Sequence, residues 1–152
     1  MKPKPKISLY EPDIPQNTAA IIRTCACLGA ELEIIKPCGF LLSDKRFKRV
    51  VMDYMDYDKI KFYQSAEHFF EEKKKQRIVL MTTKGSINYT KFNFKADDTI
   101  LFGRESAGVP EKVHKLIGDR LKIPMNENAR SLNIASSVAI VLAESLRQNN
   151  LM

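Results

Sequence analysis

The chain has 152 residues, of which 44% are hydrophobic and 28% are charged, a composition that excludes wholesale disorder and allows one domain with its own core. Lysine and arginine number 25 against 18 acidic residues. The resulting net charge of +7 favours a polyanionic partner such as nucleic acid, although many basic proteins bind none. No run of about eighteen apolar residues occurs, so we expect no membrane partner.

The cysteines and histidines argue against a disulfide framework and against a metal centre. Cys25, Cys27 and Cys38 are odd in number and lack C-x-x-C spacing, and His68 and His114 stand in unrelated contexts. The basic start, MKPKPKISLYEP, lacks the long apolar core of a secretory signal. The sequence therefore predicts a protein of the reducing cytosol that holds no metal.

The first part of the chain predicts a strand, a helix and a second strand. Ile7 to Tyr10 form the first strand. Asn17 is placed to cap a helix that continues to Leu28, and Gly29 is placed to end it. Leu32 to Ile35 form the second strand. This order predicts a parallel pair joined by a right-handed crossover.

A basic segment follows, and we expect a short amphipathic helix there. Lys45, Arg46, Lys48 and Arg49 surround Phe47, Val50 and Val51. These four basic residues fit a solvated helix face and a contact with RNA phosphates equally well. Further on, the pattern predicts a loop from Met52 to Lys59, a minor strand from Ile60 to Tyr63, and a helix from Ser65 to about Lys75 with Glu71 to Lys75 exposed.

The second half continues the alternation of strands and helices. Arg77 to Thr83 and Thr99 to Phe102 predict buried strands, and Pro110 to Ile117 predict a helix that Gly118 ends. The whole pattern indicates an α/β fold with a mostly parallel sheet and flanking helices. Without an internal repeat or a linker, residues 1–152 are expected to form a single domain.

The stretch from Leu121 to Glu144 predicts a strand, a specified polar loop and a helix. The strand should stop at Pro124, which cannot donate to a sheet. Ser131 and Asn133 suit the start of a helix. Because that helix has apolar residues on two faces, we expect it to be buried on two sides. Small residues along one edge allow another helix, backbone or ligand to approach closely. A plain capped core helix would show the same pattern.

A glycine-rich loop, Gly103 to Gly108, lies between a predicted strand and a predicted helix. It resembles a phosphate-binding loop, but Val109 and Pro110 stand where such loops carry Lys and Ser or Thr, and G-x-G-x-x-G is absent. A loop that offers its backbone without phosphate chemistry suits a nucleoside that lacks phosphates. S-adenosylmethionine is one such ligand.

Three segments together resemble a known family. They are Asn17 to Thr24 (NTAAIIRT), Leu101 to Pro110 (LFGRESAGVP) and Ile123 to Ala135 (IPMNENARSLNIA). In order and separation they are similar to the three motifs of SpoU-type RNA 2′-O-ribose methyltransferases of the SPOUT superfamily. The opening residues, the segment LLSDKRFKRVVMDY and the strand end MTTKG are most similar to the members that methylate the tRNA wobble nucleotide.

The resemblance implies a fold, a reaction and a partner. It implies a C-terminal deep trefoil knot around the methyl donor, S-adenosylmethionine, and methylation of the 2′-oxygen at tRNA position 34, on cytidine or modified uridine. It also implies a homodimer that binds the tRNA anticodon loop. Methyl transfer from a sulfonium needs positioning more than a metal, because orientation alone can supply about 7–11 kcal/mol.

The resemblance also assigns residues. For the donor these are Met81, Gly103, Ile123, Ser131 and Leu132. For catalysis they are Arg23, Asn17, Glu105, Ser131 and Asn133. Because a guanidinium stays protonated, Arg23 is better suited to hold a phosphate and orient the hydroxyl than to act as a base. Core packing for Met81 and Ile123, a helix cap for Asn17 and an exposed acid for Glu105 are the structural alternatives.

Lys45, Arg46, Lys48 and Arg49 are the candidates for phosphate contacts, with Tyr54 or Tyr57 available to stack on a splayed base. The same chemistry on ribosomal RNA or at another tRNA position is the nearest alternative. An RNA-binding protein without catalysis is another, although the motif residues argue against it. A hydrolase is disfavoured, because no G-x-S-x-G motif is present.

Overall fold

A computed structural model describes residues 2–54 and 59–152. Within these ranges the chain forms a seven-stranded sheet with the strand order β3-β2-β1-β6-β4-β7-β5, in which every neighbouring pair is parallel. The predicted α/β fold with a mostly parallel sheet is therefore confirmed. The strands are β1 (Lys6–Tyr10), β2 (Glu31–Ile35), β3 (Lys61–Tyr63), β4 (Ile78–Met81), β5 (Ile87–Asn88), β6 (Thr99–Phe102) and β7 (Asp119–Lys122).

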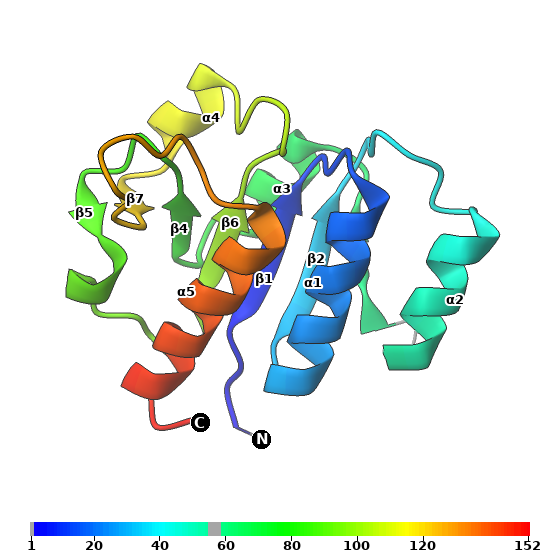
Figure 1. The fold of residues 1–152 in the computed structure, drawn as a ribbon, viewed down its shortest axis with the longest axis horizontal. Coiled ribbons are helices and arrows are strands. Elements are labelled where there is room, and N and C mark those ends of the chain that lie inside the picture. The colour runs from blue at the N-terminus through cyan, green and yellow to red at the C-terminus, as the bar shows by residue number, and fades with distance from the viewer. Residues whose placement is uncertain (1, 55–58) are drawn as a thin grey trace.

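Helices cover both faces of this sheet (Figure 1). The helices are α1 (Pro15–Leu28), α2 (Lys45–Tyr54), α3 (Ala66–Glu72), α4 (Glu111–Leu116) and α5 (Ile134–Gln148). One buried cluster joins α1, α2 and α5 to side chains such as Ile7 and Ile100, and a second joins α3 and α4 to Leu80 and Leu101 on the other face. Because both faces are covered, the central strands are buried along most of their length and are rich in apolar residues, as is usual for parallel sheets.

Helix α1 begins earlier than expected. Its first residue is Pro15, and Ile14 is the N-cap, so Asn17 lies inside the first turn and its predicted role as the cap is wrong. Proline has the helical φ value already and no N–H to satisfy, which favours it at this first position. At the other end Gly29 adopts a φ of 89° and its N–H donates to Cys25, so the predicted end is confirmed.

The basic segment forms α2, as predicted, but the helix is longer than expected. It continues to Tyr54, so the predicted loop is wrong for 52–54, and residues 55–58 of that prediction lie outside the described residues. Asp44 precedes the helix, and its carboxylate accepts from the backbone N–H groups of Arg46 and Phe47 at 2.9 and 3.1 Å. Phe47 and Val51 are buried against the core.

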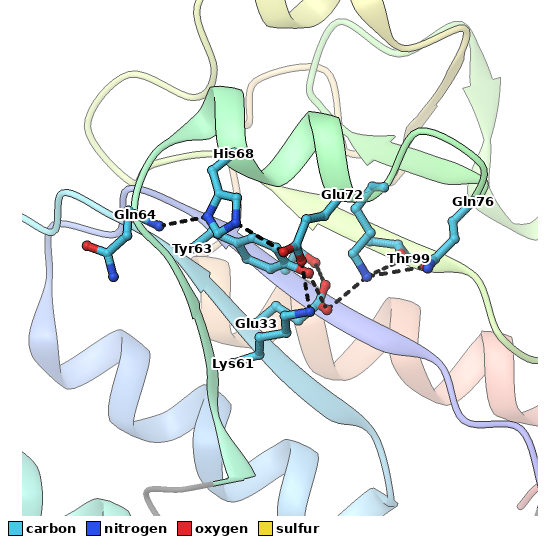
Figure 2. Close-up of polar contacts among 10 residues, drawn as sticks. Glu33, Lys61, Tyr63, Gln64, His68, Glu72, Gln76 and Thr99 are labelled. Atoms are coloured by element: carbon cyan, nitrogen blue, oxygen red, sulfur yellow. Dashed lines mark hydrogen bonds and ion pairs between the residues drawn. The ribbon is translucent and has the colours of Figure 1, made fainter.

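Lys73 is buried, which corrects the prediction that Glu71 to Lys75 are all exposed. Helix α3 ends at Glu72, and the side chain of Lys73 is only 3% exposed. Its Nζ lies 2.8 Å from Glu33 Oε2 and donates to Thr99 Oγ1 at 3.3 Å. Tyr63 and Ser8 donate to the same carboxylate, and Figure 2 labels Glu33, Tyr63 and Thr99 of this group. A charge is tolerated in a sheet core only when paired in this way, and local sequence does not reveal such a partner.

The segment after β4 passes close to the backbone of β7. A Cβ at Gly85 would lie 2.4 Å from the carbonyl carbon of Leu121, and Thr82 N–H donates to Leu121 O at 2.9 Å. From there the chain returns as α5 to pack beside α1 (Figure 1). The trefoil knot stays a prediction, and these close approaches are the kind that threading needs. Among the described residues no helix is long and apolar enough to cross a membrane.

Candidate functional site

A cavity of about 500 Å³ lies at the carboxyl ends of β4, β6 and β7. The carboxyl ends of parallel strands meet at one edge of a sheet, so the loops that follow them converge there, which is the usual place for a ligand in such folds. The start of α1 and the N-terminus of α5 close the cavity. Of the predicted site residues, its lining contains Asn17, Met81, Gly103, Glu105, Ile123, Ser131, Leu132 and Asn133.

The loop from Gly103 to Gly108 forms one wall, and its two glycines make it tight. Arg104 and Gly108 exchange two backbone hydrogen bonds of 3.1 and 2.9 Å. Gly108 has a φ of 64°, and a Cβ at Gly103 would lie 2.6 Å from the Gly108 backbone. Only glycine fits both positions without a shift of the loop. The loop therefore presents backbone groups to the cavity at close range.

Asn133 connects two of the three motif segments. Its Oδ1 accepts from the backbone N–H groups of Ala135 and Ser136, so of the two residues predicted at the start of α5, Asn133 is the cap, whereas Ser131 lies before the helix. Its Nδ2 donates to Asn17 Oδ1 at 3.0 Å. A single amide thus caps one helix and holds the first turn of another.

Asp13 and Glu105 join the first motif region to the second. The backbone N–H of Asp13 donates to Glu105 Oε2 at 3.2 Å, and the Ser106 hydroxyl donates to the Asp13 carboxylate. The side-chain hydrogen bond with the Glu105 carboxyl group lowers the pKa of Asp13. Burial, followed by the hydrogen bond with Asp13, raises the pKa of Glu105. Opposite shifts of this kind are expected when two carboxyl groups lie close together and interact.

The cavity also has an apolar side. Met81 is 9% exposed at the end of β4, and Ile123 packs against the same core cluster, so both serve the core and the cavity together. Thr82 and Thr83 line the cavity as well, and sequence reasoning missed them. Their position directly after a confident buried strand could have identified them, by the same rule on strand ends.

Arg23 is not among the residues that line the cavity. It is exposed on α1, and its guanidinium carbon lies 4.9 Å from the ring centre of Tyr54, at the end of α2. This is the geometry of a cation–π contact. The structure therefore brings Asn17, but not Arg23, to the cavity within one chain.

The basic side chains of α2 lie on the surface, next to α1. Lys45, Arg46, Lys48 and Arg49 are all exposed, and α2 packs directly on α1. Tyr54 is exposed too, whereas Tyr57 lies outside the described residues. Arg23, Tyr54 and the basic side chains of α2 thus come from two adjacent helices that cover the same face of the sheet.

A metal centre was not expected, and within residues 2–54 and 59–152 no group of three His, Cys, Asp or Glu side chains is placed to hold a metal ion. The lining of the cavity suits an organic ligand, because it combines apolar side chains with backbone groups and a few polar side chains.

Comparisons with known proteins agree with the motifs. The model of the SpoU rRNA Methylase family matches residues 4–143. A tRNA (cytidine(34)-2′-O)-methyltransferase of Beijerinckia indica is 48% identical over 144 residues, which cover 93% of this chain and 90% of that protein. The Escherichia coli protein of the same name is 36% identical over 93% of this chain and 92% of its own length.

A solved structure described as "Structural insights into the 2-OH methylation of C/U34 on tRNA" superimposes with a TM-score of 0.89 at 36% identity. The match covers 97% of this chain and 97% of that chain. Family model, relatives and structure all span nearly the whole sequence, including the three segments that meet at the cavity. The chain therefore belongs to the SpoU rRNA Methylase family.

Proposed function

We propose that this protein is an S-adenosylmethionine-dependent methyltransferase that modifies the ribose 2′-oxygen of nucleotide 34, the wobble position, in tRNA. The names of its relatives and the description of the solved structure support this activity and this nucleotide, cytidine or uridine. The observation that carries the proposal is that all three motif segments line one cavity. We propose that residues 1–152 act as one domain, in the cytoplasm.

The cavity fits the methyl donor. A nucleoside without phosphates needs flat apolar contacts for the adenine faces and backbone groups for its edges. Met81 and Ile123 supply the first, and the backbone at Gly103, which approaches closely because a Cβ is absent there, supplies the second. Ser131 and Leu132 close the cavity from the segment that leads into α5. The bound donor supplies an electrophilic methyl group, and its sulfonium leaves without help from a metal.

The protein contributes orientation, and proximity of well-aligned reactants accounts for a large part of such a rate. Asn17 and Asn133 form a fixed polar pair at the cavity wall, and each is fixed at the start of a helix. Ser131 and Glu105 are the other polar side chains that the motifs assign to this wall. Together they hold the ribose against the methyl group.

The tRNA is bound by the adjacent faces of α1 and α2. Lys45, Arg46, Lys48 and Arg49 contact phosphates of the anticodon stem and loop, and Tyr54 offers an aromatic face to a splayed base. Arg23 holds a phosphate beside the target ribose. A guanidinium suits this role because it is always charged and can donate two parallel hydrogen bonds to a phosphate.

The active form is a homodimer, in which a second subunit extends a surface that is small for a whole tRNA. Large apolar side chains remain exposed near the cavity and on α5: Ile14 at 39%, Leu132 at 41% and Ile140 at 37%. Burial against a partner would remove them from water. A dimer also offers Arg23 a route to a cavity, because a partner's α1 could place it at the opening.

Methylation of defined RNAs tests the proposal. The protein is incubated with isotope-labelled S-adenosylmethionine and tRNA transcripts, and the product is mapped by nuclease digestion and mass spectrometry. We expect one 2′-O-methyl group at nucleotide 34. A transcript with 2′-deoxyribose at nucleotide 34 should accept none. Labelling of ribosomal RNA or of another tRNA nucleotide instead would overturn the assigned position, and RNA binding without transfer would overturn the reaction.

A further inference from the structure

Glu105 has a distinctive place among the cavity residues. Of the described residues that line the cavity, it is the only one with a carboxylate or an imidazole, the two groups that most often accept protons near neutral pH. His68 and His114 lie elsewhere, and Arg104 and Arg23 are permanently charged. Methylation of a hydroxyl releases a proton, so a group that accepts it is needed at this wall.

Asp13 holds Glu105 in place from the loop between β1 and α1. Its backbone N–H donates to Glu105 Oε2 at 3.2 Å, and its carboxylate accepts from Ser106, the residue after Glu105. Gly39 packs on Asp13 from the other side, since a Cβ at Gly39 would lie 2.6 Å from Asp13 Cβ. Asp13 therefore cannot move away without breaking the contacts of two loops.

The two carboxyl groups are short of donors. Asp13 Oδ1 and Glu105 Oε1 are both buried and have no hydrogen-bond partner among the described residues. A proton taken up by Glu105 would supply a donor that this pair lacks, so the ionised pair favours accepting one. The pKa shifts agree, because that of Asp13 is lowered and that of Glu105 is raised by burial and by Asp13. Glu105 is thus the member of the pair that gains and loses the proton closer to neutral pH.

Other charges nearby are an ion pair, a lysine over an aromatic ring and two exposed side chains, and among the described residues Arg104 Nε is buried without a hydrogen-bond partner. In the same two loops, 11–14 and 103–109, the remaining charged side chains are Glu11 and Arg104, whose Oε1 and Nη1 lie 3.5 Å apart. In segment 36–40, which packs on Asp13, Lys36 lies over the ring of Phe62. In the loop before α5, the side chains of Glu127 and Arg130 are exposed.

We propose that Asp13 is a positioning residue that holds the Glu105 carboxylate at the cavity wall as the acceptor of the target hydroxyl proton. The inference rests on the proposed function. The 2′-oxygen forms a bond to the methyl carbon, the carbon–sulfur bond breaks with its electron pair on sulfur, and the hydroxyl proton passes to Glu105. The resulting carboxylic acid then returns the proton to water. Charge balances, because the cationic donor becomes a neutral thioether as one proton is released.

Single-turnover rates, measured from acidic to alkaline pH with the donor already bound, test this assignment. In the wild type the rate should fall as pH drops through the pKa of Glu105, because the protonated acid cannot accept a proton. Glu105→Gln should lower the plateau by about 100-fold or more while donor binding by calorimetry is kept. Asp13→Asn removes the carboxylate that raises this pKa, so the acidic limb should shift to lower pH.

Two variants serve as controls. Asp13→Glu keeps a carboxylate and the backbone N–H, and should leave the acidic limb near that of the wild type. Glu11→Gln removes a carboxylate from the same loop without contact to Glu105, and should not shift the limb. A Glu105→Gln plateau within threefold of the wild type would overturn the proposal, as would an unshifted limb in folded Asp13→Asn. A wild-type protein that transfers no methyl to nucleotide 34 would instead overturn the proposed function.

Discussion

Asn133 and Asn17 are 116 residues apart in sequence, yet their side-chain amides meet at 3.0 Å between Nδ2 and Oδ1. The contact joins the N-terminus of α5 to the first turn of α1 at the edge of the cavity, and α1 and α5 pack along their length (Figure 1). The Asn133 side chain therefore contributes both to the stability of the fold and to the geometry of the cavity.

Substitutions can separate the two roles of the Asn133 side chain, the helix cap made by its oxygen and the hydrogen bond that its nitrogen donates to Asn17. Asn133→Ala removes the cap and should lower the free energy of unfolding by about 1 kcal/mol. Asn133→Asp keeps the capping oxygen but loses the donor to Asn17, so it should stay closer to the wild type in urea titrations while methyl transfer falls. Equal stability of the two variants would contradict the assignment of the cap.

Arg23→Ala should abolish methylation but leave the fold and donor binding intact, because Arg23 is exposed and outside the cavity. Arg23→Lys should restore little, since an ammonium cannot make the paired hydrogen bonds of a guanidinium. Circular dichroism, calorimetry with S-adenosylmethionine and the transfer assay measure the three properties. Unchanged turnover in Arg23→Ala would remove this residue from the mechanism.

Mixed dimers decide which cavity Arg23 serves. An Arg23→Ala subunit is combined with a Gly103→Ala subunit, whose added Cβ would lie 2.6 Å from the Gly108 backbone and disrupt the cavity. If Arg23 acts in the partner's cavity, the mixture regains activity that neither variant has alone, because one intact composite site forms. No recovery in a verified heterodimer would place Arg23 in its own chain's site.

The basic face of α2 should control the salt dependence of tRNA binding. Replacement of its four exposed basic residues by Ala should reduce the slope of log affinity against log salt by about 3, which corresponds to four lost phosphate contacts. A matched control replaces four exposed lysines of the α3 and α4 side of the sheet. The variants are Lys45→Ala, Arg46→Ala, Lys48→Ala and Arg49→Ala, and the controls are Lys74→Ala, Lys75→Ala, Lys112→Ala and Lys115→Ala. Equal slopes for both sets would refute a specific role for α2.

Gly85 tests the close passage of the chain segments. Gly85→Ala forces a Cβ against the Leu121 backbone and should destabilise the protein by about 1–3 kcal/mol, as overpacking does. Gly118→Ala is the matched control, because its Cβ would have nothing within 4 Å and its φ is not positive. The control should be neutral or slightly stabilising, since alanine restricts the unfolded chain. Urea unfolding measures both.

The buried pair of Lys73 and Glu33 should behave as a unit. Lys73→Met leaves the Glu33 carboxylate buried without its cation and should cost about 3–5 kcal/mol in the free energy of unfolding. The double variant with Glu33→Gln should recover part of that loss, because no charge remains in the core. A double variant less stable than Lys73→Met would contradict this account.

The sequence by itself determined the alternation of elements, the parallel sheet, the end of α1 at Gly29, the cap of α5 and eight of the cavity residues. The elements and their ends follow from local rules, namely hydrophobic periodicity and the conformations of glycine and proline. The eight cavity residues come instead from the resemblance of three segments to the motifs of a known family. It also predicted the basic face of α2, because the four cations surround apolar residues at helical spacing.

Only the tertiary structure decided which distant side chains meet. Asp13 lies 92 residues from Glu105, and Lys73 pairs with Glu33 across the sheet, so neither contact leaves a mark in local sequence. Arg23 and Asn17 share a helix and a motif, yet only Asn17 lines the cavity. Strand order, register and helix rotation fix such neighbours, because together they set where each side chain points once the apolar faces are buried.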